Sequence, residues 1–431
     1  MKVAFISQGF GSIKPPAVSG SISIWTYEVI SELKKTNFIV AYEMDGKKLH
    51  SVHNNYEGID YVYAPTLLNT LMNNCHQKLV NLLKKNVGVS RSVRKPIFSS
   101  ILYNLGYILW VSLNLKKQQC DIIHVHQFSQ YVPVLRFFNP KSKIILHMSC
   151  EWLTQLDATR MRRRMAKADL ILGNSDYISE KIEKKFPKFK GKIKTIYNGV
   201  DHKQFLSLDK TPQNDNRHHP KLLFVGRVSP EKGIHVLIGA IKKLVTEYPL
   251  IHINIVGSKG SAPKEFIVDL DEQATVKALS KFYGESLGGE DYYYSCLKRL
   301  ITDDITGHIT FCGSMPHASV VEFYQHSDIL INPSLSESFG MSLVEAMASG
   351  KPTISTRVGG MVNVVSEGET GLLVEPDNEE KLAAAIAFLT EKPEMKKNMG
   401  IAGRKRVMEK FSWERVAEST LNEYLRLISK P

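Results

Sequence analysis

The feature that most constrains the fold is a repeated alternation of short apolar, β-branched segments with helical stretches. In the first half of the chain these segments read VAFIS, DIIHVH, KIILHMS and LILGNS. In the second half they read KLLFVGR, HINIVGS, HITFCGS and ILINPS, followed by TISTR. Short apolar strands separated by helices are typical of parallel sheets that helices cover on both faces. Because the alternation occurs twice, the sequence predicts two doubly wound α/β units.

A polar segment separates the two runs of strands. After Asp201 the chain passes through SLDKTPQNDNRHHP, which has no apolar period and is typical of a linker. We therefore predict a first domain over residues 1–200, a linker over 201–219 and a second domain over 220–411. The last segment, 412–431, has helical spacing of apolar residues and predicts a terminal amphipathic helix. Its expected apolar face comprises Phe411, Val416, Leu421, Tyr424 and Leu427.

Composition bounds the class of protein. With 431 residues, 43% of them hydrophobic and 23% charged, the chain has the composition of a globular protein of two domains. The net charge of +13 favours an anionic partner, namely nucleic acid, an acidic membrane or a phosphorylated ligand, although a generally basic surface is an equal alternative. Five scattered cysteines without a C-x-x-C pair predict neither disulfides nor a zinc site, and they favour a cytoplasmic location.

Two segments bear on membranes. The apolar run that follows Met1 is too short for a signal peptide and is typical of a first strand. Residues 97–115 carry no charge, and basic residues flank them on both sides. This composition favours a buried helix. A helix that touches the membrane is a weaker alternative, and a helix that spans the membrane is the weakest.

Three further segments have weaker signals. Residues 259–305 exceed a usual connection between strands, so they contain helices of their own or form a functional loop. Residues 9–14 begin like a dinucleotide fingerprint but lack its third glycine, which argues against NAD. The basic cluster at 160–167 has no aromatic platform beside it, so nucleic acid is not an expected partner.

The strongest chemical signal is a pair of glutamates around a helix start. Glu337 and Glu345 lie on either side of Gly340 in ESFGMSLVE, directly after a predicted strand. A helix is predicted to begin between Phe339 and Ser342, so its free amides can bind an anion such as a diphosphate. A carboxylate on the first turns can accept hydrogen bonds from vicinal hydroxyls of a ribose. The alternative is that both glutamates merely complement the helix dipole.

A second signal follows the first strand of the second domain, in VGRVSPEKG. Gly226 allows a sharp turn, and Arg227 and Lys232 then project from a loop at the carboxyl end of the strand. Two cations at this position suit the diphosphate of a departing nucleotide. The alternative is a pair of solvated loop residues.

These residues resemble retaining glycosyltransferases of family 4, which have the GT-B fold. The resemblance rests on ESFGMSLVE and GRVSPEKG, and it extends through the flanking stretches from about Lys221 to Pro376. It implies two Rossmann-like domains facing a cleft, the first for the acceptor and the second for the nucleotide-sugar donor. It also implies that the terminal helix crosses back to the first domain.

The resemblance further implies roles for single residues. Arg227 and Lys232 hold the donor diphosphate, Glu345 binds the ribose and Glu337 lies against the donor sugar. Around them, the implied donor contacts are Gly226, Met315, Pro316, Phe339, Gly340, Met341 and Ser342. In the first domain, Gly20 matches the family's glycine-rich loop, although Ser19 replaces a second glycine. His147 matches the histidine that the family places near the sugar, and His126 is a further candidate on the acceptor side.

The expected activity is transfer of a sugar from a UDP- or GDP-linked donor to a lipid-linked, cell-envelope or small-molecule acceptor, with the anomeric configuration retained. The resemblance implies no metal and no cofactor, since the nucleotide sugar is a co-substrate. A sugar phosphorylase, a nucleotide-sugar epimerase and a non-catalytic binding protein remain alternatives. Basic residues at 91–95 and 160–167 raise a further hypothesis, that the first domain docks on the anionic inner face of a membrane.

Overall fold

The computed structural model describes residues 1–8, 12–15, 20–44, 50–86, 96–205, 219–285 and 291–429. They form two compact units, one of residues 1–198 with 413–431 and one of residues 199–412. Most of the expected linker, residues 206–218, lies outside the described residues. Each unit is an α/β sandwich around a mostly parallel sheet, so the predicted fold class is confirmed.

The described part of the first unit contains one sheet of eight strands, ordered β3-β4-β2-β1-β5-β6-β7-β8. The strands are β1 (Lys2–Ile6), β2 (Phe38–Met44), β3 (Val52–Tyr56), β4 (Ile59–Ala64), β5 (Ile122–His126), β6 (Lys143–Met148), β7 (Leu170–Gly173) and β8 (Ile193–Thr195). All neighbours are parallel except β3 and β4, which form an antiparallel hairpin. Glu57 and Gly58 turn this hairpin with φ of 50° and 80°, the left-handed conformations that a two-residue hairpin favours.

Helices cover both faces of this sheet. They are α1 (Ser21–Leu33), α2 (Leu67–Asn86), α3 (Leu105–Gln118), α4 (Tyr131–Phe138), α5 (Trp152–Gln155), α6 (Ala158–Met165) and α7 (Asp176–Lys185), with short 3₁₀ turns at Ile97–Ser99 and Pro187–Lys192. Within the uncharged stretch 97–115, α3 buries a face that includes Tyr107, Val111 and Leu115. None of the helices in the described ranges is both long and apolar enough to cross a membrane.

The second unit repeats the design with six described strands, all parallel, in the order β11-β10-β9-β12-β13-β14. They are β9 (Lys221–Val225), β10 (His252–Val256), β11 (Ile309–Gly313), β12 (Ile329–Asn332), β13 (Thr353–Thr356) and β14 (Gly371–Val374). The helices are α8 (Ile234–Leu244), α9 (Lys264–Ile267), α10 (Ala274–Ala278), α11 (Tyr292–Leu300), α12 (His317–His326), α13 (Met341–Ala348), α14 (Met361–Val364), α15 (Glu379–Thr390) and α16 (Pro393–Lys410). The segment 259–305 therefore contains helices of its own, α9 to α11.

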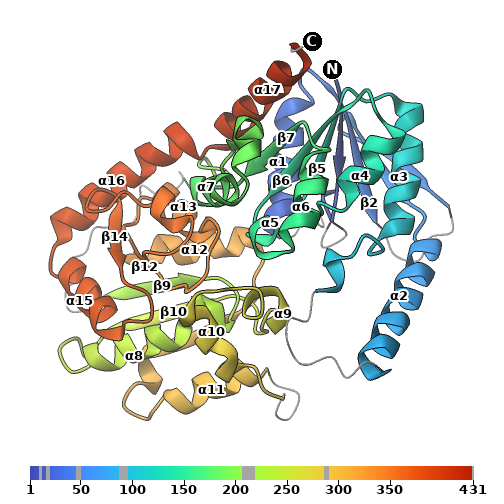
Figure 1. Ribbon diagram of the computed structural model, residues 1–431. Helices are drawn as coiled ribbons and strands as arrows, with labels where there is room; N and C mark the ends of the chain where they lie inside the picture. Colours follow the sequence, from blue (N-terminus) through green and yellow to red (C-terminus); the bar gives the residue numbers. More distant parts are fainter. Residues whose placement is uncertain are drawn as a thin grey trace. The chain divides into compact units, whose positions relative to one another are not determined.

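The terminal helix α17 (Trp413–Ser429) belongs to the first unit. It packs beside α1, as Figure 1 shows in red and blue, and its Trp413, Val416 and Tyr424 join the apolar core of that unit. The sequence also placed Phe411 on this helix face, which is wrong. Phe411 instead follows α16 and is buried in the second unit, where its ring contacts Phe339.

Candidate active site

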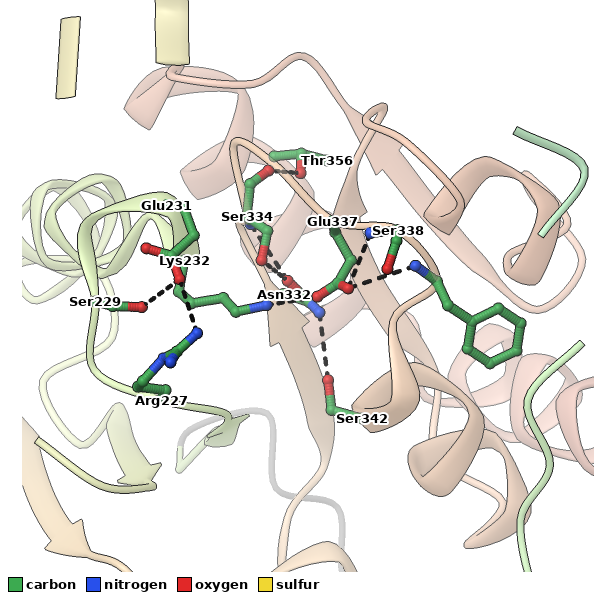
Figure 2. Close-up of polar contacts among 11 residues, drawn as sticks. Arg227, Ser229, Glu231, Lys232, Asn332, Ser334, Glu337, Ser338, Ser342 and Thr356 are labelled. Atoms are coloured by element: carbon green, nitrogen blue, oxygen red, sulfur yellow. Dashed lines mark hydrogen bonds and ion pairs between the residues drawn. The ribbon is translucent and has the colours of Figure 1, made fainter. Parts of the chain in front are cut away.

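The two sequence signals of the second unit meet at one edge of its sheet. Strand β9 leads into the loop of Arg227 and the short 3₁₀ turn Pro230–Lys232, and β12 leads into the loop of Glu337. Strands β9 and β12 are parallel neighbours, so their carboxyl ends and the loops that follow lie side by side. Figure 2 shows Lys232 extending from the first loop to Glu337 on the second.

An ion pair joins these two loops. Lys232 Nζ lies 2.6 Å from Glu337 Oε2, and the side chains are only 20% and 16% exposed. The other oxygen of Glu337 accepts hydrogen bonds from the amides of Ser338 and Phe339, at 3.1 and 3.4 Å. The pair holds both groups in their charged forms in a place where water is scarce.

The pKa values follow from this arrangement. Burial by itself raises the pKa of Glu337, but the charge and hydrogen bond of Lys232 and the two amides outweigh it, so the pKa is lowered. Burial likewise would lower the pKa of Lys232, yet Glu337 and Glu231 outweigh it and the pKa is raised. Both groups are therefore ionised throughout the neutral range.

Arg227 is held more loosely. Its Nη2 lies 3.4 Å from Glu231 Oε1, and its side chain is 45% exposed, whereas that of Glu231 is 3% exposed. Ser229 also donates a hydrogen bond to Glu231, at 2.6 Å. Glu231, which the sequence reasoning did not single out, thus fixes the loop while the Arg227 side chain stays 45% exposed. Its place between Pro230 and Lys232 in the phosphate motif was the available signal.

Two glycines let neighbouring loops approach the loop of Glu337 closely, Gly233 after the Lys232 turn and Gly359 after β13. Gly233 has φ of 68°, and a Cβ there would lie 2.1 Å from the carbonyl oxygen of Pro333. Gly359 has φ of 55°, and a Cβ there would lie 1.7 Å from the carbonyl oxygen of Glu337. Any larger residue at either position would force the loops apart. The sequence analysis did not identify these two positions.

Helix α13 begins at the site. Gly340 caps it with φ of 98°, and Ser342 is tied to Asn332 at the end of β12 by a bond of 3.3 Å. The amides of Met341 and Ser342 lie in the first turn, where no carbonyl of the same helix can accept from them. Phe339 is buried just before the helix and orients the loop. The arrangement offers amide donors and the positive end of a helix dipole beside Lys232.

Glu345 faces a different part of the same unit. It is 8% exposed, accepts a hydrogen bond of 2.5 Å from the hydroxyl of Tyr324, and lies 3.1 Å from His317 Nε2. Tyr324 and His317 both belong to α12, two turns apart and hence on one face. The sequence reasoning missed both, although that spacing was the available signal. Met315 and Pro316 precede this helix, half-buried and exposed respectively.

In the first unit, Gly20 caps the start of α1 with φ of 83°, while Val18 and Ser19 of the expected glycine-rich loop lie outside the described residues. His126 is the last residue of β5 and His147 the last but one of the neighbouring β6, and the two lie opposite one another in register. They are 2% and 1% exposed, so both imidazoles are buried. His124, two residues before His126 on β5, is fully buried with them, and the three rings surround Trp25.

The three histidines are neutral. Burial lowers the pKa of His147 to about 3, and burial reinforced by the neighbouring rings lowers the pKa values of His124 and His126 well below their ordinary range. One ring nitrogen from each histidine lies within 4.8 Å of the corresponding nitrogens of the other two, close enough for the group to be considered as metal ligands. The resemblance implied no metal, and the sequence did not predict this cluster, because His124 and His126 lie on one strand and His147 on another, and only the pairing of β5 with β6 brings the three rings together.

The basic cluster at 160–167 is not uniformly exposed, which corrects one expectation. Arg164 is 4% exposed and donates hydrogen bonds to Ser129 Oγ at 3.2 Å and to the carbonyl of Ser99 at 2.8 Å. Because the position falls on the inner face of α6, it anchors that helix and cannot face a membrane. Arg162 and Arg163 remain exposed, whereas Arg91, Arg94 and Lys95 lie outside the described residues.

Two family models match the chain. "Glycosyltransferase Family 4" matches residues 61–204, and "Glycosyl transferases group 1" matches residues 208–406. One falls on the first unit and the other on the second. Together they support a glycosyltransferase of the family 4 type with the GT-B fold.

Curated relatives point the same way. The chain is 27% identical to spore coat protein SA of Bacillus subtilis, over 73% of this chain and 80% of that protein. It is 27% identical to D-inositol 3-phosphate glycosyltransferase 2 of Catenulispora acidiphila, over 61% and 57%, and 30% identical to an uncharacterized glycosyltransferase of Methanocaldococcus jannaschii, over 60% of each. The match thus spans less than two thirds of these two glycosyltransferases.

Solved structures share the fold. Sucrose-phosphate synthase from Thermosynechococcus elongatus superposes with a TM-score of 0.70 at 19% identity, covering 100% of both chains. The Anabaena protein HepE, solved in complex with UDP, gives a TM-score of 0.67 at 18% identity, over 99% of this chain and 100% of that one. The fold of this protein is therefore GT-B.

Proposed function

We propose that the protein transfers a sugar from a nucleotide-diphosphate sugar, UDP- or GDP-linked, to an acceptor and retains the anomeric configuration. The observation that carries the proposal is the Lys232–Glu337 ion pair beside the start of α13. The relatives that are glycosyltransferases support the reaction class. HepE structures with UDP and with UDP-glucose support a nucleotide sugar as the donor.

In this proposal the leaving diphosphate is stabilised by fixed positive groups. The Lys232 ammonium has three N–H donors, one of which Glu337 occupies, so others are available to phosphate oxygens. Arg227, half-exposed, can turn its planar guanidinium to the same group. The amides at the start of α13 add dipoles that need no rearrangement during reaction. These cations supply the charge that a metal would otherwise bring, so we propose a reaction without metal or cofactor.

The two glutamates divide the remaining work. Glu345, held between Tyr324 and His317, presents a carboxylate with a fixed orientation for the two ribose hydroxyls. Glu337 keeps its negative charge because of Lys232, and it can accept a hydrogen bond from a hydroxyl of the donor sugar. His147 is proposed to act at the reacting sugar and His126 on the acceptor side, as the family resemblance implies.

A donor screen tests the reaction class. Thermal shift with a panel of UDP- and GDP-sugars should identify one donor, since a ligand at 100 times its Kd stabilises by about 2.7 kcal/mol. Transfer or slow hydrolysis of that donor should follow, and NMR should show the anomeric configuration unchanged. An inverted product, turnover that requires free phosphate, or epimerisation without an acceptor would each contradict the proposal. Binding without any turnover would indicate a binding protein.

We further propose that the acceptor is lipid-linked or part of the cell envelope, and that the first unit docks on an anionic membrane. Arg162 and Arg163 are exposed on α6, and each cation near an anionic surface contributes about 1 kcal/mol. Liposome flotation at low salt should show binding to anionic but not neutral vesicles. Arg162→Ser with Arg163→Ser should weaken it, whereas the control pair Lys242→Ser with Lys277→Ser, exposed cations of the second unit, should not. Equal recovery with both kinds of vesicle would refute docking.

A further inference from the structure

A chain of hydrogen bonds connects the terminal helix to His147. The hydroxyl of Tyr424, on α17, lies 2.6 Å from His124 Nδ1. His124 Nε2 in turn lies 3.2 Å from His147 Nδ1. All three side chains are buried, with exposed fractions of 0%, 0% and 1%. The chain of hydrogen bonds therefore runs through the buried interior of the first unit, from α17 to the last but one residue of strand β6.

The direction of these bonds follows from what each group can donate. A phenol buried without water has one O–H, and leaving that donor unpaired costs more than leaving a lone pair of its oxygen unused. Tyr424 therefore donates to His124 Nδ1. A neutral imidazole that accepts at Nδ1 carries its proton on Nε2, so His124 donates to His147 Nδ1. By the same rule His147 carries its proton on Nε2.

The far end of the chain is an unpaired donor. His147 Nε2 is buried and has no hydrogen-bond partner among the residues that the structure describes. His147 stays neutral, so the protonated nitrogen is fixed by its neighbours and not by pH. An unpaired buried N–H is costly, and a hydroxyl oxygen that accepted its hydrogen bond would relieve that cost.

We propose that Tyr424 and His124 are positioning residues, which fix His147 as an Nε2–H hydrogen-bond donor to an oxygen of the substrate sugar. The inference rests on the proposed function, since it assigns the direction of the hydrogen bond that His147 makes at the reacting sugar. It also gives the terminal helix a part in the site beyond packing. His126 stands outside the chain, because its Nε2 lies 3.1 Å from Thr26 Oγ1, whose own proton goes to the carbonyl of Ile22.

A metal ion held by the three histidines is the competing arrangement. It would use His124 Nε2 and His147 Nδ1 as ligands and reverse the proton on His124, which would then donate to Tyr424. Against it, the described surroundings of the rings are Trp25, Phe5, Tyr424 and Thr26, which include no carboxylate or thiolate to balance a divalent charge. The two arrangements differ in the protonation of His124 and in metal content, so one set of measurements separates them.

The test reads ring protonation directly. The protein labelled with ¹⁵N-histidine, at neutral pH and without donor, should show His147 protonated at Nε2 and bare at Nδ1, with signals assigned from single His→Gln variants. In Tyr424→Phe, which removes only the hydroxyl, His124 and His147 should each become mixtures of tautomers. The kcat for the donor identified above should fall roughly five- to tenfold, the size of one lost hydrogen bond, with KM nearly unchanged.

Tyr107→Phe is the matched control. Tyr107 is equally buried in the same unit, and its hydroxyl donates to the carbonyl of Tyr42 at 3.2 Å without touching a histidine. This variant should keep both the tautomers and the kcat, and its melting temperature calibrates the loss of one buried hydroxyl bond. A His147 protonated at Nδ1 in the wild type, unchanged tautomers in Tyr424→Phe, or stoichiometric zinc in the purified protein would each overturn the proposal. The NMR measurement needs no donor, so it tests the tautomers independently of the reaction. If the expected tautomers were found in a protein that turns over no nucleotide sugar, only the proposed function would be overturned.

Discussion

Both units place polar side chains near the carboxyl ends of neighbouring parallel strands, but these side chains are charged in the second unit and neutral in the first. At the carboxyl ends of β9 and β12, Lys232 and Glu337 are paired, partly exposed and charged. At the carboxyl ends of β5 and β6, His126 and His147 are buried and neutral. The parallel sheet determines where functional side chains gather, while the neighbours of each side chain decide whether it carries charge.

Charged and neutral side chains are suited to binding different parts of a substrate. A charged pair beside a helix start is suited to holding a diphosphate, because its field is strong where water is scarce. A neutral imidazole with a fixed proton is suited to recognising a hydroxyl group, because it offers a donor of known direction without attracting an anion. In the second unit the charge is stabilised by an opposite charge, whereas in the first unit the tautomer is set by a chain of hydrogen bonds.

The largest expected effect tests the charged side of this comparison. Lys232→Ala should reduce turnover by at least about 10²-fold, since it removes a fixed cation from the leaving group. Arg227→Ala should cause a loss of the same order. Steady-state kinetics with the donor from the screen measures both.

Lys232→Ala also leaves Glu337 buried without its partner, so its melting temperature should fall. Arg227→Ala should lower the melting temperature less, because the buried Glu231 keeps the hydrogen bond from Ser229 and the nearby charge of Lys232. Lys243→Ala is the control, because Lys243 also pairs with a glutamate, Glu380, but at the exposed surface. Near-normal turnover in both Lys232→Ala and Arg227→Ala would remove these residues from the mechanism.

A second prediction separates the two units by pH. The folded pKa values of the three histidines lie below the ordinary 6.5, so their stabilising contribution is full above about pH 6.5 and is lost as the pH falls. At about pH 5 the loss should be roughly 2 kcal/mol for His147 alone. Glu337 contributes fully to the free energy of unfolding above its ordinary pKa of 4.5, and this contribution is lost only as the pH falls below that value. Lys232 contributes fully below its ordinary pKa of 10.5, and its contribution is lost as the pH rises above that value.

Tryptophan fluorescence can follow the first unit selectively, because Trp25, Trp110, Trp152 and Trp413 are the four tryptophans of the chain and all belong to it. Urea denaturation at about pH 7 and pH 5 should therefore show a weakened first unit. His147→Gln should lose less stability over that interval than the wild type. Equal losses in the two proteins would show that His147 titrates normally when folded.

A third prediction concerns the ribose. Glu345→Gln should raise the donor KM about tenfold with little change in kcat, because a hydrogen bond to a part of the donor that does not react contributes to binding alone. Glu322→Gln, an exposed glutamate on α12, serves as the control. A fall in kcat with unchanged KM would instead place Glu345 at the reacting sugar.

The smallest expected effect is that of chelation. EDTA should leave activity unchanged, because cationic side chains serve the diphosphate and the histidine cluster is proposed to hold protons instead of a metal. Loss of activity that Mg²⁺ or Mn²⁺ restores would show that a metal, and not cationic side chains alone, serves the diphosphate. Loss of activity that only Zn²⁺ restores would show that the histidine cluster holds a metal.

Much of the second unit could be predicted from local sequence. Its motifs lie within single strand–loop–helix segments, so the start of α13 near Gly340 and the loop cations after β9 follow from a few adjacent residues. The antiparallel hairpin of β3 and β4 was not predicted, because β3 is a polar, exposed edge strand without the apolar run that marks a buried strand. The role of Arg164 was also missed, since one helix turn decides whether a cation faces water or the carbonyl of Ser99.

By itself, the sequence determined two doubly wound units and the strand ends at which chemistry is concentrated. These follow from the period of apolar residues and from glycine and charge at strand ends, which are properties of neighbouring residues. Only the tertiary structure decided which distant groups meet. Lys232 finds Glu337 because β9 and β12 are neighbours, and Tyr424 reaches His124 because α17 returns to the first unit. Strand order and helix docking depend on the packing of the whole core, and no local pattern of residues records them.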